Sequence, residues 1–515
     1  MAMNDDEYHL QFPNTFGKNK QLFPNIFGKI GQLFHKIFGK IGQLFPKIFG
    51  KKNAILLKIS IFAASILNSK KMKRKLYGSL LKWKNDPDRK PLVLEGARQV
   101  GKTWLLKEFG KNEYDNLVYV NFHDDTEAQS LFAKNLNVNR IKEWLEAYTQ
   151  KRIIAGRTLI FLDEIQEAER GLDSLKSFCD NARKQHVVVA GSLLGTTHRK
   201  GESYPVGKVN LLRLFPMSFE EFLWAKGADQ LAQIVMRPEW DIPAPLHSML
   251  EEYLRQYYYV GGMPEAVLHY TTMGDVNKVR SIQKDILKTY DNDFAKHAGN
   301  ETERVRLVWQ SVPAQLAKEN KKFIYGAVKS GGRARELESA IQWLVNAGLV
   351  YKIHRCTSPD MPLSFYEDFD AFKLYVLDVG LLGAMSKAPV RLMLTNNDVF
   401  KEYKGAFSEN YVLEQLKTFD DLGIYYFSKE NSTQEIDFLV QTEERIIPIE
   451  VKAEVNVKSK SMHGFVVNDH ADKQLKGLRC SMLPYKDQGW MENIPLYGIS
   501  GYIKHQYEVE TGVDE

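Results

Sequence analysis

The chain has 515 residues, 44% hydrophobic and 26% charged, which is enough for two to four domains with buried cores. Its three cysteines, Cys179, Cys356 and Cys480, lie far apart without CxxC or Cys/His spacing; this argues against a disulfide framework or structural zinc and is compatible with a reducing cytosol. The net charge of +6 comes from residues 1–71, with eleven lysines against three acids; residues 72–515 hold 59 basic and 61 acidic residues, so bulk charge does not indicate nucleic-acid binding.

The first segment repeats with a period of eleven, as in "QLFPNIFGKIG", over residues 11–53. Proline and glycine in these repeats break a continuous helix. The apolar run that follows, "AILLKISIFAASILN", is shorter than the about 20 residues of a membrane span, so no integral membrane role is expected. A membrane-surface arm and an uncleaved signal-like segment are the functional alternatives. We predict a disordered basic extension over residues 1–71 and a first natural helix near Met72.

A phosphate-binding loop follows in "PLVLEGARQVGKTWLLKEFG", where an apolar strand leads through Gly96-x4-Gly101-Lys102-Thr103 into a helix. Glycines let such a loop turn its backbone N–H groups, including those of Gln99 and Val100, towards a phosphate chain at the helix N-terminus. Lys102 is expected to reach the β- and γ-phosphates of ATP, and the Thr103 hydroxyl to ligate Mg²⁺.

Two further strands end in polar residues. "RTLIFLDEIQ" ends in Asp163, expected to hold Mg²⁺ through water, and Glu164, expected to polarise the attacking water. "QHVVVAGSLLG" leads to Ser192, which is either a sensor of the γ-phosphate or an ordinary turn serine. With "LVYVNFHDD" and "KVNLLRLFP" these make at least five strand candidates alternating with helices, the pattern of a parallel sheet covered on both faces.

The motifs "GARQVGKT", "IFLDEIQ", "GSLLG", "YPVGKVNLLRLFPMSFEEFLWA" and "GGMPEAV" resemble the AAA-type ATP-binding proteins of bacteria and archaea, which pair a P-loop ATPase with a C-terminal domain of unknown function. The similarity runs from Met72 almost to the end of the chain and implies ATP binding and hydrolysis. Such enzymes often borrow an arginine from a neighbouring subunit, which implies a homo-oligomer; Lys208 and Arg213 are the local candidates.

The middle region contains a Gly261-Gly262 break between two helices, which is a candidate hinge. We expect the tyrosines just before it, at 257–259, to pack in a core rather than to stack on bases. Residues 318–355 read as helix, turn, helix and strand, the layout of a winged helix. The basic residues at the start of its second helix either contact DNA or form a solvated face of a domain connection; they are Lys329, Arg333 and Arg335.

The last motif, "EIDFLVQTEERIIPIEVKA", predicts two strands around a charged turn. Because side chains alternate along a strand, Glu450 and Lys452 share one face, and Asp437 is expected opposite them. The arrangement resembles the PD-(D/E)xK nuclease fold, with Glu409 as its helical acid. It implies Mg²⁺ between Asp437 and Glu450 and a lysine that orients water against a phosphodiester.

Two features of this motif qualify the resemblance. Ile436 replaces the proline that names the motif, and Pro448 indicates an edge strand. A surface ion-pair cluster on an inactive fold is therefore the alternative to catalysis. Lys458 and Lys460, near the next helix start, either contact a phosphate backbone or are simply solvated.

Together these patterns predict an α/β protein with four parts. They are an extension (1–71), an AAA-type P-loop domain (72–245), a helical, winged-helix-like region (246–360) and a restriction-endonuclease-like domain (361–505). The expected function is an Mg²⁺-dependent ATPase in the cytoplasm, coupled to a nuclease-like domain that acts on DNA. The alternative is a nucleotide-gated DNA- or protein-binding switch without nuclease activity.

Overall fold

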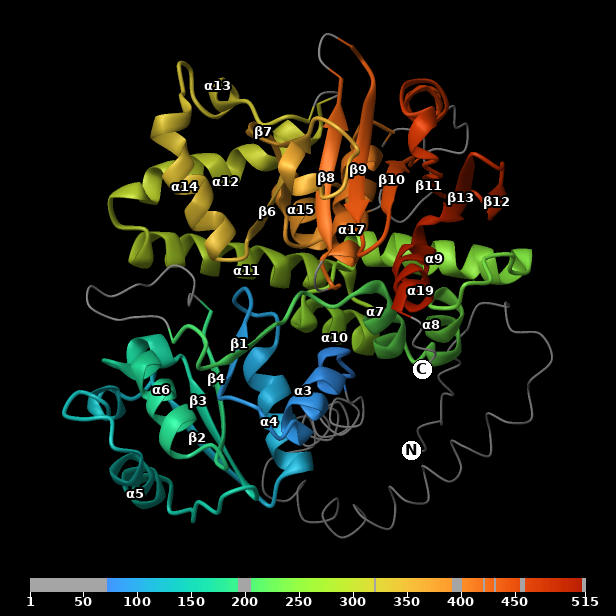
Figure 1. Ribbon diagram of the computed structural model, residues 1–515. Coiled ribbons are helices and arrows are strands. Elements are labelled where there is room, and N and C mark those ends of the chain that lie inside the picture. Colours follow the sequence, from blue (N-terminus) through green and yellow to red (C-terminus); the bar gives the residue numbers. More distant parts are fainter. Residues whose placement is uncertain are drawn as a thin grey trace, which may run out of the picture. The chain divides into compact units, whose positions relative to one another are not determined.

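The computed structural model describes residues 72–192, 205–318, 321–390, 401–419, 422–429, 432–453 and 459–511 (Figure 1). These residues belong to one compact unit that begins at Met72. The predicted extension over 1–71 and Lys458 lie outside the described residues. No described helix is both long and apolar enough to cross a bilayer.

The N-terminal part contains a parallel five-stranded sheet in the order β2-β3-β4-β1-β5. Strands β3 and β4 are buried along their whole length, as expected for strands covered by helices on both faces. The five strand candidates of the sequence are therefore all present. The strands are β1 (Leu92–Glu95), β2 (Asn116–Asn121), β3 (Thr158–Asp163), β4 (His186–Ala190) and β5 (Asn210–Arg213), and the helices are α3 (Leu76–Asn85), α4 (Lys102–Glu113), α5 (Val138–Thr149) and α6 (Gly171–Asn181).

Helices dominate the next part of the chain. Each strongly amphipathic helix buries one apolar stripe, such as that of Leu337, Ile341 and Leu344 in α14. The helices are α7 (Phe219–Lys226), α8 (Asp229–Val235), α9 (Ala244–Val260), α10 (Pro264–Met273), α11 (Val276–His297), α12 (Thr302–Leu316), α13 (Tyr325–Val328) and α14 (Ala334–Asn346).

The C-terminal part is built on a mixed eight-stranded sheet in the order β12-β13-β11-β10-β9-β8-β6-β7. Strand β6, the last element of the predicted winged helix, pairs with β7 and β8 in this sheet, so the sheet extends across the predicted boundary at residue 360. The strands are β6 (Val350–Cys356), β7 (Glu367–Val376), β8 (Gly423–Ser428), β9 (Glu435–Gln441), β10 (Ile446–Val451), β11 (Gly477–Ser481), β12 (Lys486–Asp487) and β13 (Met491–Pro495), and the helices are α15 (Val379–Met385), α17 (Lys401–Leu416), α18 (Lys460–His463) and α19 (Ile499–Thr511).

The edge position inferred from Pro448 is wrong. Strand β10 lies inside the sheet, antiparallel to β9 and parallel to β11. The proline is tolerated because the pairing with β11 begins only at Ile449, so Pro448 stands just before that ladder, where a missing N–H breaks no bond to β11.

Aromatic residues join the N-terminal, helical and C-terminal parts in one shared hydrophobic cluster. The ring of Phe219 (α7) packs edge-on against Tyr257 (α9) at 5.8 Å and against Tyr411 (α17) at 6.3 Å between centroids. Tyr257 and Tyr259 are buried, which agrees with packing rather than base stacking.

The Gly261-Gly262 break is a close crossing of three segments. Gly262 donates its N–H to Asp378 Oδ2 (2.5 Å), and its carbonyl accepts the N–H of Met217 (2.7 Å). A Cβ on Gly262 would lie 2.2 Å from the Met217 carbonyl oxygen, so only glycine fits without a shift of the backbone. The hinge role stays a prediction.

Asp378 gives the unfolding free energy a testable pH dependence. Burial raises the pKa of this carboxyl to about 6, although the N–H groups of Gly262 and Leu381 bond to it. Folding therefore favours its protonated form, and this stabilisation is present below about pH 4 and is lost as the pH rises through 6. Relative to Asp378→Asn, the wild type should lose roughly 2–3 kcal/mol between pH 4 and pH 7 in denaturant unfolding. Parallel pH curves for the two proteins would contradict a buried carboxyl at this position.

Candidate nucleotide site and C-terminal carboxylate–lysine cluster

The loop between β1 and α4 is a tight turn with several residues at positive φ. Gly96 and Gly101 have φ values of 145° and 96°, and Gln99 has a φ of 69°. A Cβ on Gly96 would lie 2.3 Å from the carbonyl oxygen of Leu214, so the loop can approach β5 only with glycine there. Gly101 immediately precedes α4, which places the loop at a helix N-terminus.

Lys102 lies inside this loop. Its ammonium group donates to the carbonyl oxygens of Gly96 (2.7 Å) and Ala97 (2.8 Å). Burial lowers its pKa to about 8, against the opposing effect of Glu164 and Asp163. The cation is thus held where a phosphate chain would replace the carbonyl groups as its partner.

Thr103 and Asp163 meet as the sequence predicts. The Thr103 hydroxyl donates to Asp163 Oδ2 (2.8 Å), and the Tyr119 hydroxyl donates to the same oxygen (3.2 Å). Burial raises the pKa of Asp163, partly offset by the Thr103 bond. A hydroxyl and a carboxylate side by side are the hard oxygen donors that Mg²⁺ prefers, so these two residues fit a magnesium ion.

Glu164 and Ser192 are brought together at the ends of β3 and β4. The Ser192 N–H lies 3.3 Å from Glu164 Oε2, and its hydroxyl lies 3.4 Å from each carboxylate oxygen. Glu164 has a left-handed backbone conformation, with φ of 50°, an unusual state for a non-glycine residue. The serine is therefore a contact of the proposed base, and its role as a phosphate sensor stays a prediction.

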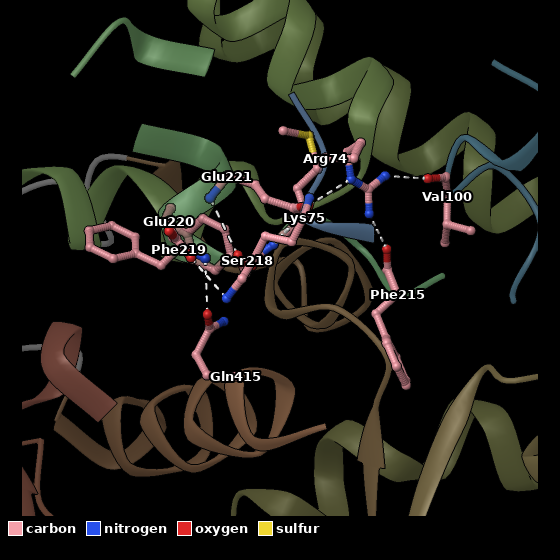
Figure 2. A network of polar contacts seen from close by, with 11 residues as sticks. Arg74, Lys75, Val100, Phe215, Ser218, Phe219, Glu220, Glu221 and Gln415 are labelled. Atoms are coloured by element: carbon pink, nitrogen blue, oxygen red, sulfur yellow. Dashed lines mark hydrogen bonds and ion pairs between the residues drawn. The ribbon is translucent and has the colours of Figure 1, made fainter. Parts of the chain in front are cut away.

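A buried arginine that the sequence analysis missed is hydrogen-bonded to the loop between β1 and α4 (Figure 2). Arg74 donates to the Val100 carbonyl (2.8 Å) and the Phe215 carbonyl (2.6 Å), and its Nε lies 3.1 Å from Glu221 Oε1. Glu221 also closes the capping box of α7 with Ser218. The sequence analysis interpreted this segment only as the start of a first helix near Met72 and assigned Arg74 no contact.

Contacts continue from this network to the C-terminal part. The backbone N–H of Phe219 donates to Gln415 Oε1 of α17 (3.0 Å), as Figure 2 shows. Helix α17 also carries Glu409, so the support of the loop and the C-terminal cluster share one helix.

The predicted C-terminal residues converge. Asp437 Oδ2 accepts the N–H of Val451 (2.8 Å), and the Lys452 ammonium lies 3.0 Å from Glu450 Oε1. Burial lowers the pKa of Lys452, but Glu450 and Asp437 outweigh this effect and hold the pKa above its ordinary value. Burial and the negative charge of Asp437 raise the pKa of Glu409. Glu409 is therefore near enough to Asp437 to belong to the same cluster.

Two lysines that the sequence analysis missed complete the cluster. Lys321 forms an ion pair with Glu409, and the fully buried Lys373 forms one with Glu435. A signal existed for Lys373, the one charged residue of the apolar run "AFKLYVL"; for Lys321 there was none.

The cluster fits a divalent cation only in part. Glu450 Oε2 is buried without a hydrogen-bond partner, as expected of an oxygen that awaits a ligand. Within the described ranges, however, no three His, Cys, Asp or Glu side chains are grouped closely enough to hold a metal. Asp437 and Glu450 are thus a pair of candidate metal ligands, and lysines already neutralise some of the carboxylates around them.

Other predicted residues have ordinary partners. Lys208 pairs with Asp180 (2.6 Å) and Arg213 with Glu95 (3.0 Å). Lys329 pairs with Glu336 (3.3 Å), and Arg333 immediately precedes α14. Arg333 and Arg335 are exposed at the N-terminal end of α14, and a contact of these residues with DNA stays a prediction.

Three family models match consecutive parts of the chain. An AAA domain covers residues 88–223, a domain of unknown function (DUF8612) covers 251–392, and a second domain of unknown function (DUF4143) covers 404–497. Residues 88–223 are thus similar to AAA domains, in agreement with the P-loop and the parallel sheet. The match over 404–497 assigns no activity, so the nuclease-like fold stays a prediction.

No curated protein matches the chain. Solved structures similar to it include the Thermotoga maritima RuvB Holliday junction branch migration motor, at 16% identity over 58% of this chain and 89% of that one, with a TM-score of 0.25. The Aeropyrum pernix Orc1 protein in complex with DNA has 15% identity, 62% and 93% coverage and a TM-score of 0.23. AMPPCP-bound DnaA from Aquifex aeolicus has 12% identity, 53% and 88% coverage and a TM-score of 0.23. Scores of this size carry no functional assignment.

Proposed function

We propose that the chain is an Mg²⁺-dependent ATPase whose nucleotide state controls its C-terminal part. The observation that carries this proposal is the contact of Thr103 with Asp163 beside the Lys102 ammonium, inside a glycine-shaped loop. These are the groups that bind a triphosphate and its metal in P-loop domains.

Each residue of the site has one task in hydrolysis. The loop N–H groups and Lys102 would bind the phosphates, and Thr103 and Asp163 would hold Mg²⁺, whose charge would offset that of the phosphate oxygens. Glu164 orients the attacking water and accepts its proton, and Ser192 fixes the Glu164 carboxylate by the contacts given above.

We further propose that the C-terminal cluster acts on the phosphodiester backbone of DNA. Lys452 is held charged by Glu450 and Asp437 and would stabilise negative charge on a phosphate. Asp437 and Glu450 would hold Mg²⁺, and the unpartnered Glu450 oxygen supports that role. The three described cysteines are free and buried, which agrees with a cytoplasmic location. In a homo-oligomer, a neighbouring subunit would supply the arginine that stabilises the transition state of ATP hydrolysis.

The nuclease proposal predicts that Asp437→Asn lowers cleavage at least about 100-fold, because the change removes a carboxylate that holds the metal. Supercoiled DNA with Mg²⁺ and ATP gives the readout, and nicking by the wild type is expected. Asp472→Asn is the matched control, since its side chain is 71% exposed in the same part of the chain. Intact DNA with the wild type, or equal nicking by Asp437→Asn, would sink the nuclease proposal.

A nucleotide-gated binding switch without nuclease chemistry is the second candidate. Glu409 forms an ion pair with Lys321, and Glu435 forms one with Lys373. These ion pairs support the second candidate, because carboxylates that bind a metal ion would not be neutralised by lysines. ATP-dependent and salt-sensitive retention of DNA by both wild type and Asp437→Asn, without cleavage, would favour this candidate.

A further inference from the structure

A cavity of about 490 Å³ adjoins the start of the phosphate-binding loop. One wall contains Gly96 and Ala97 of the loop together with Ser192 after β4. The facing wall comes from the C-terminal half of the chain, with Tyr351 on β6 and Lys417 just after α17. The cavity thus connects the nucleotide site to the part of the chain that carries the carboxylate–lysine cluster.

Its charged lining is mainly basic. Three cations, those of Arg213, Lys352 and Lys417, line it together with the carboxylate of Glu95. Arg213 is neutralised by Glu95 at 3.0 Å, and Lys352 by an ion pair with Glu338. A cavity with this charge balance favours an anionic ligand.

Lys417 is the cation without a counter-charge in this lining. No acidic side chain of the described residues forms an ion pair with it, and its ammonium group lies over the Tyr351 ring, 5.9 Å from the centroid. Burial, reinforced by Arg213, lowers the pKa of Lys417 to about 8. Lys417 is half-buried at the cavity wall, and a partly desolvated ammonium group without a counter-charge is stabilised when an anion binds beside it.

The position of the cavity indicates which anion. Gly96, Ala97 and Ser192 border it, and Ser192 contacts Glu164, the residue placed to act on the attacking water. The end of a triphosphate that the water attacks is its terminal phosphate. The aromatic lining would also suit a nucleotide base, but a base brings no charge to balance Lys417.

We propose that this cavity receives the terminal phosphate of the bound nucleoside triphosphate, and that Lys417 is the cation that recognises it. The inference rests on the proposed ATPase function and adds a residue from outside the AAA-like segment. Lys417 follows directly on α17, which carries Glu409, so a change at the terminal phosphate would act on the helix of the C-terminal cluster.

The test compares two nucleotides by calorimetry on the full chain. Lys417→Met is expected to bind ADP within about twofold of the wild type and a non-hydrolysable ATP analogue about 10- to 100-fold more weakly, the loss of one charge-assisted hydrogen bond. Unchanged ADP binding also shows that the variant is folded. Lys417→Arg should recover most of the ATP affinity, because it restores the charge. Lys504→Met, at an exposed lysine of α19 that pairs with Glu508, is the control.

Two results would overturn the inference. Equal binding of the ATP analogue by wild type and Lys417→Met would show that no phosphate meets the lysine. Equal weakening of ADP and ATP analogue would place the base or the inner phosphates in the cavity instead. Both results leave the ATPase proposal standing, whereas a wild type that binds neither nucleotide would remove both.

Discussion

Replacement of Glu164 by glutamine is expected to lower the rate of ATP hydrolysis about 10²- to 10⁴-fold while ATP binding stays within a few-fold of the wild type. The amide keeps the size of the side chain and an oxygen for the Ser192 contacts, but it cannot accept a proton from water. Phosphate release gives the rate, and calorimetry with ATP and Mg²⁺ gives the affinity. The variant should therefore hold ATP without turning it over.

Glu169→Gln is the matched control for this change, since Glu169 lies five residues further along the chain and is exposed. It should hydrolyse ATP at the wild-type rate. If Glu164→Gln keeps the full rate, the water is activated by another group. If Glu164→Gln also loses ATP binding, the Glu164–Ser192 contacts maintain the structure of the site, and Glu164 is not assigned a role in activating water.

The geometry of the candidate nucleotide site was predictable because its signals are local. Glycines, a lysine and a threonine at fixed spacing between a strand and a helix can form only a few structures, and the loop is one of them. The sequence assigned Thr103 and Asp163, 60 residues apart, to one magnesium ion, and the direct hydrogen bond between them agrees with that placement at one edge of the parallel sheet.

The cations near the C-terminal cluster were not predictable in the same way. Lys321 and Glu409 are 88 positions apart, and Lys373 and Glu435 are 62 apart, on elements whose pairing depends on the topology of the whole mixed sheet. The sequence placed Glu450 and Lys452 on one face, since that needs only strand alternation, and expected Asp437 to face them from the partner strand. The side chains that neutralise the acids come from distant segments, and no pattern in those segments marks their partners.

The contacts of Arg74 were not predictable either. Arg74 lies at the start of the described chain, and its partners are 26 to 147 positions away. It forms a fully enclosed ion pair, with Arg74 and Glu221 side chains each 4% exposed. Its two bonds to the carbonyl groups of Val100 and Phe215 fix the loop against the segment that follows β5. Loss of this side chain would thus affect stability and nucleotide binding together.

Arg74→Met is expected to lower the free energy of unfolding by about 3–5 kcal/mol, because it leaves the Glu221 carboxylate buried without its cation. It should also weaken ADP binding, since the Val100 carbonyl loses the donor that fixes the loop. Denaturant unfolding and calorimetry measure the two effects. Lys73→Met is the control: its ion pair with Asp229 has side chains 61% and 47% exposed, so a change within about 1 kcal/mol and normal ADP binding are expected. If the two variants unfold alike, the Arg74–Glu221 pair does not support the loop, and the chain of contacts from the loop through Phe219 and Gln415 to α17 loses its first contact.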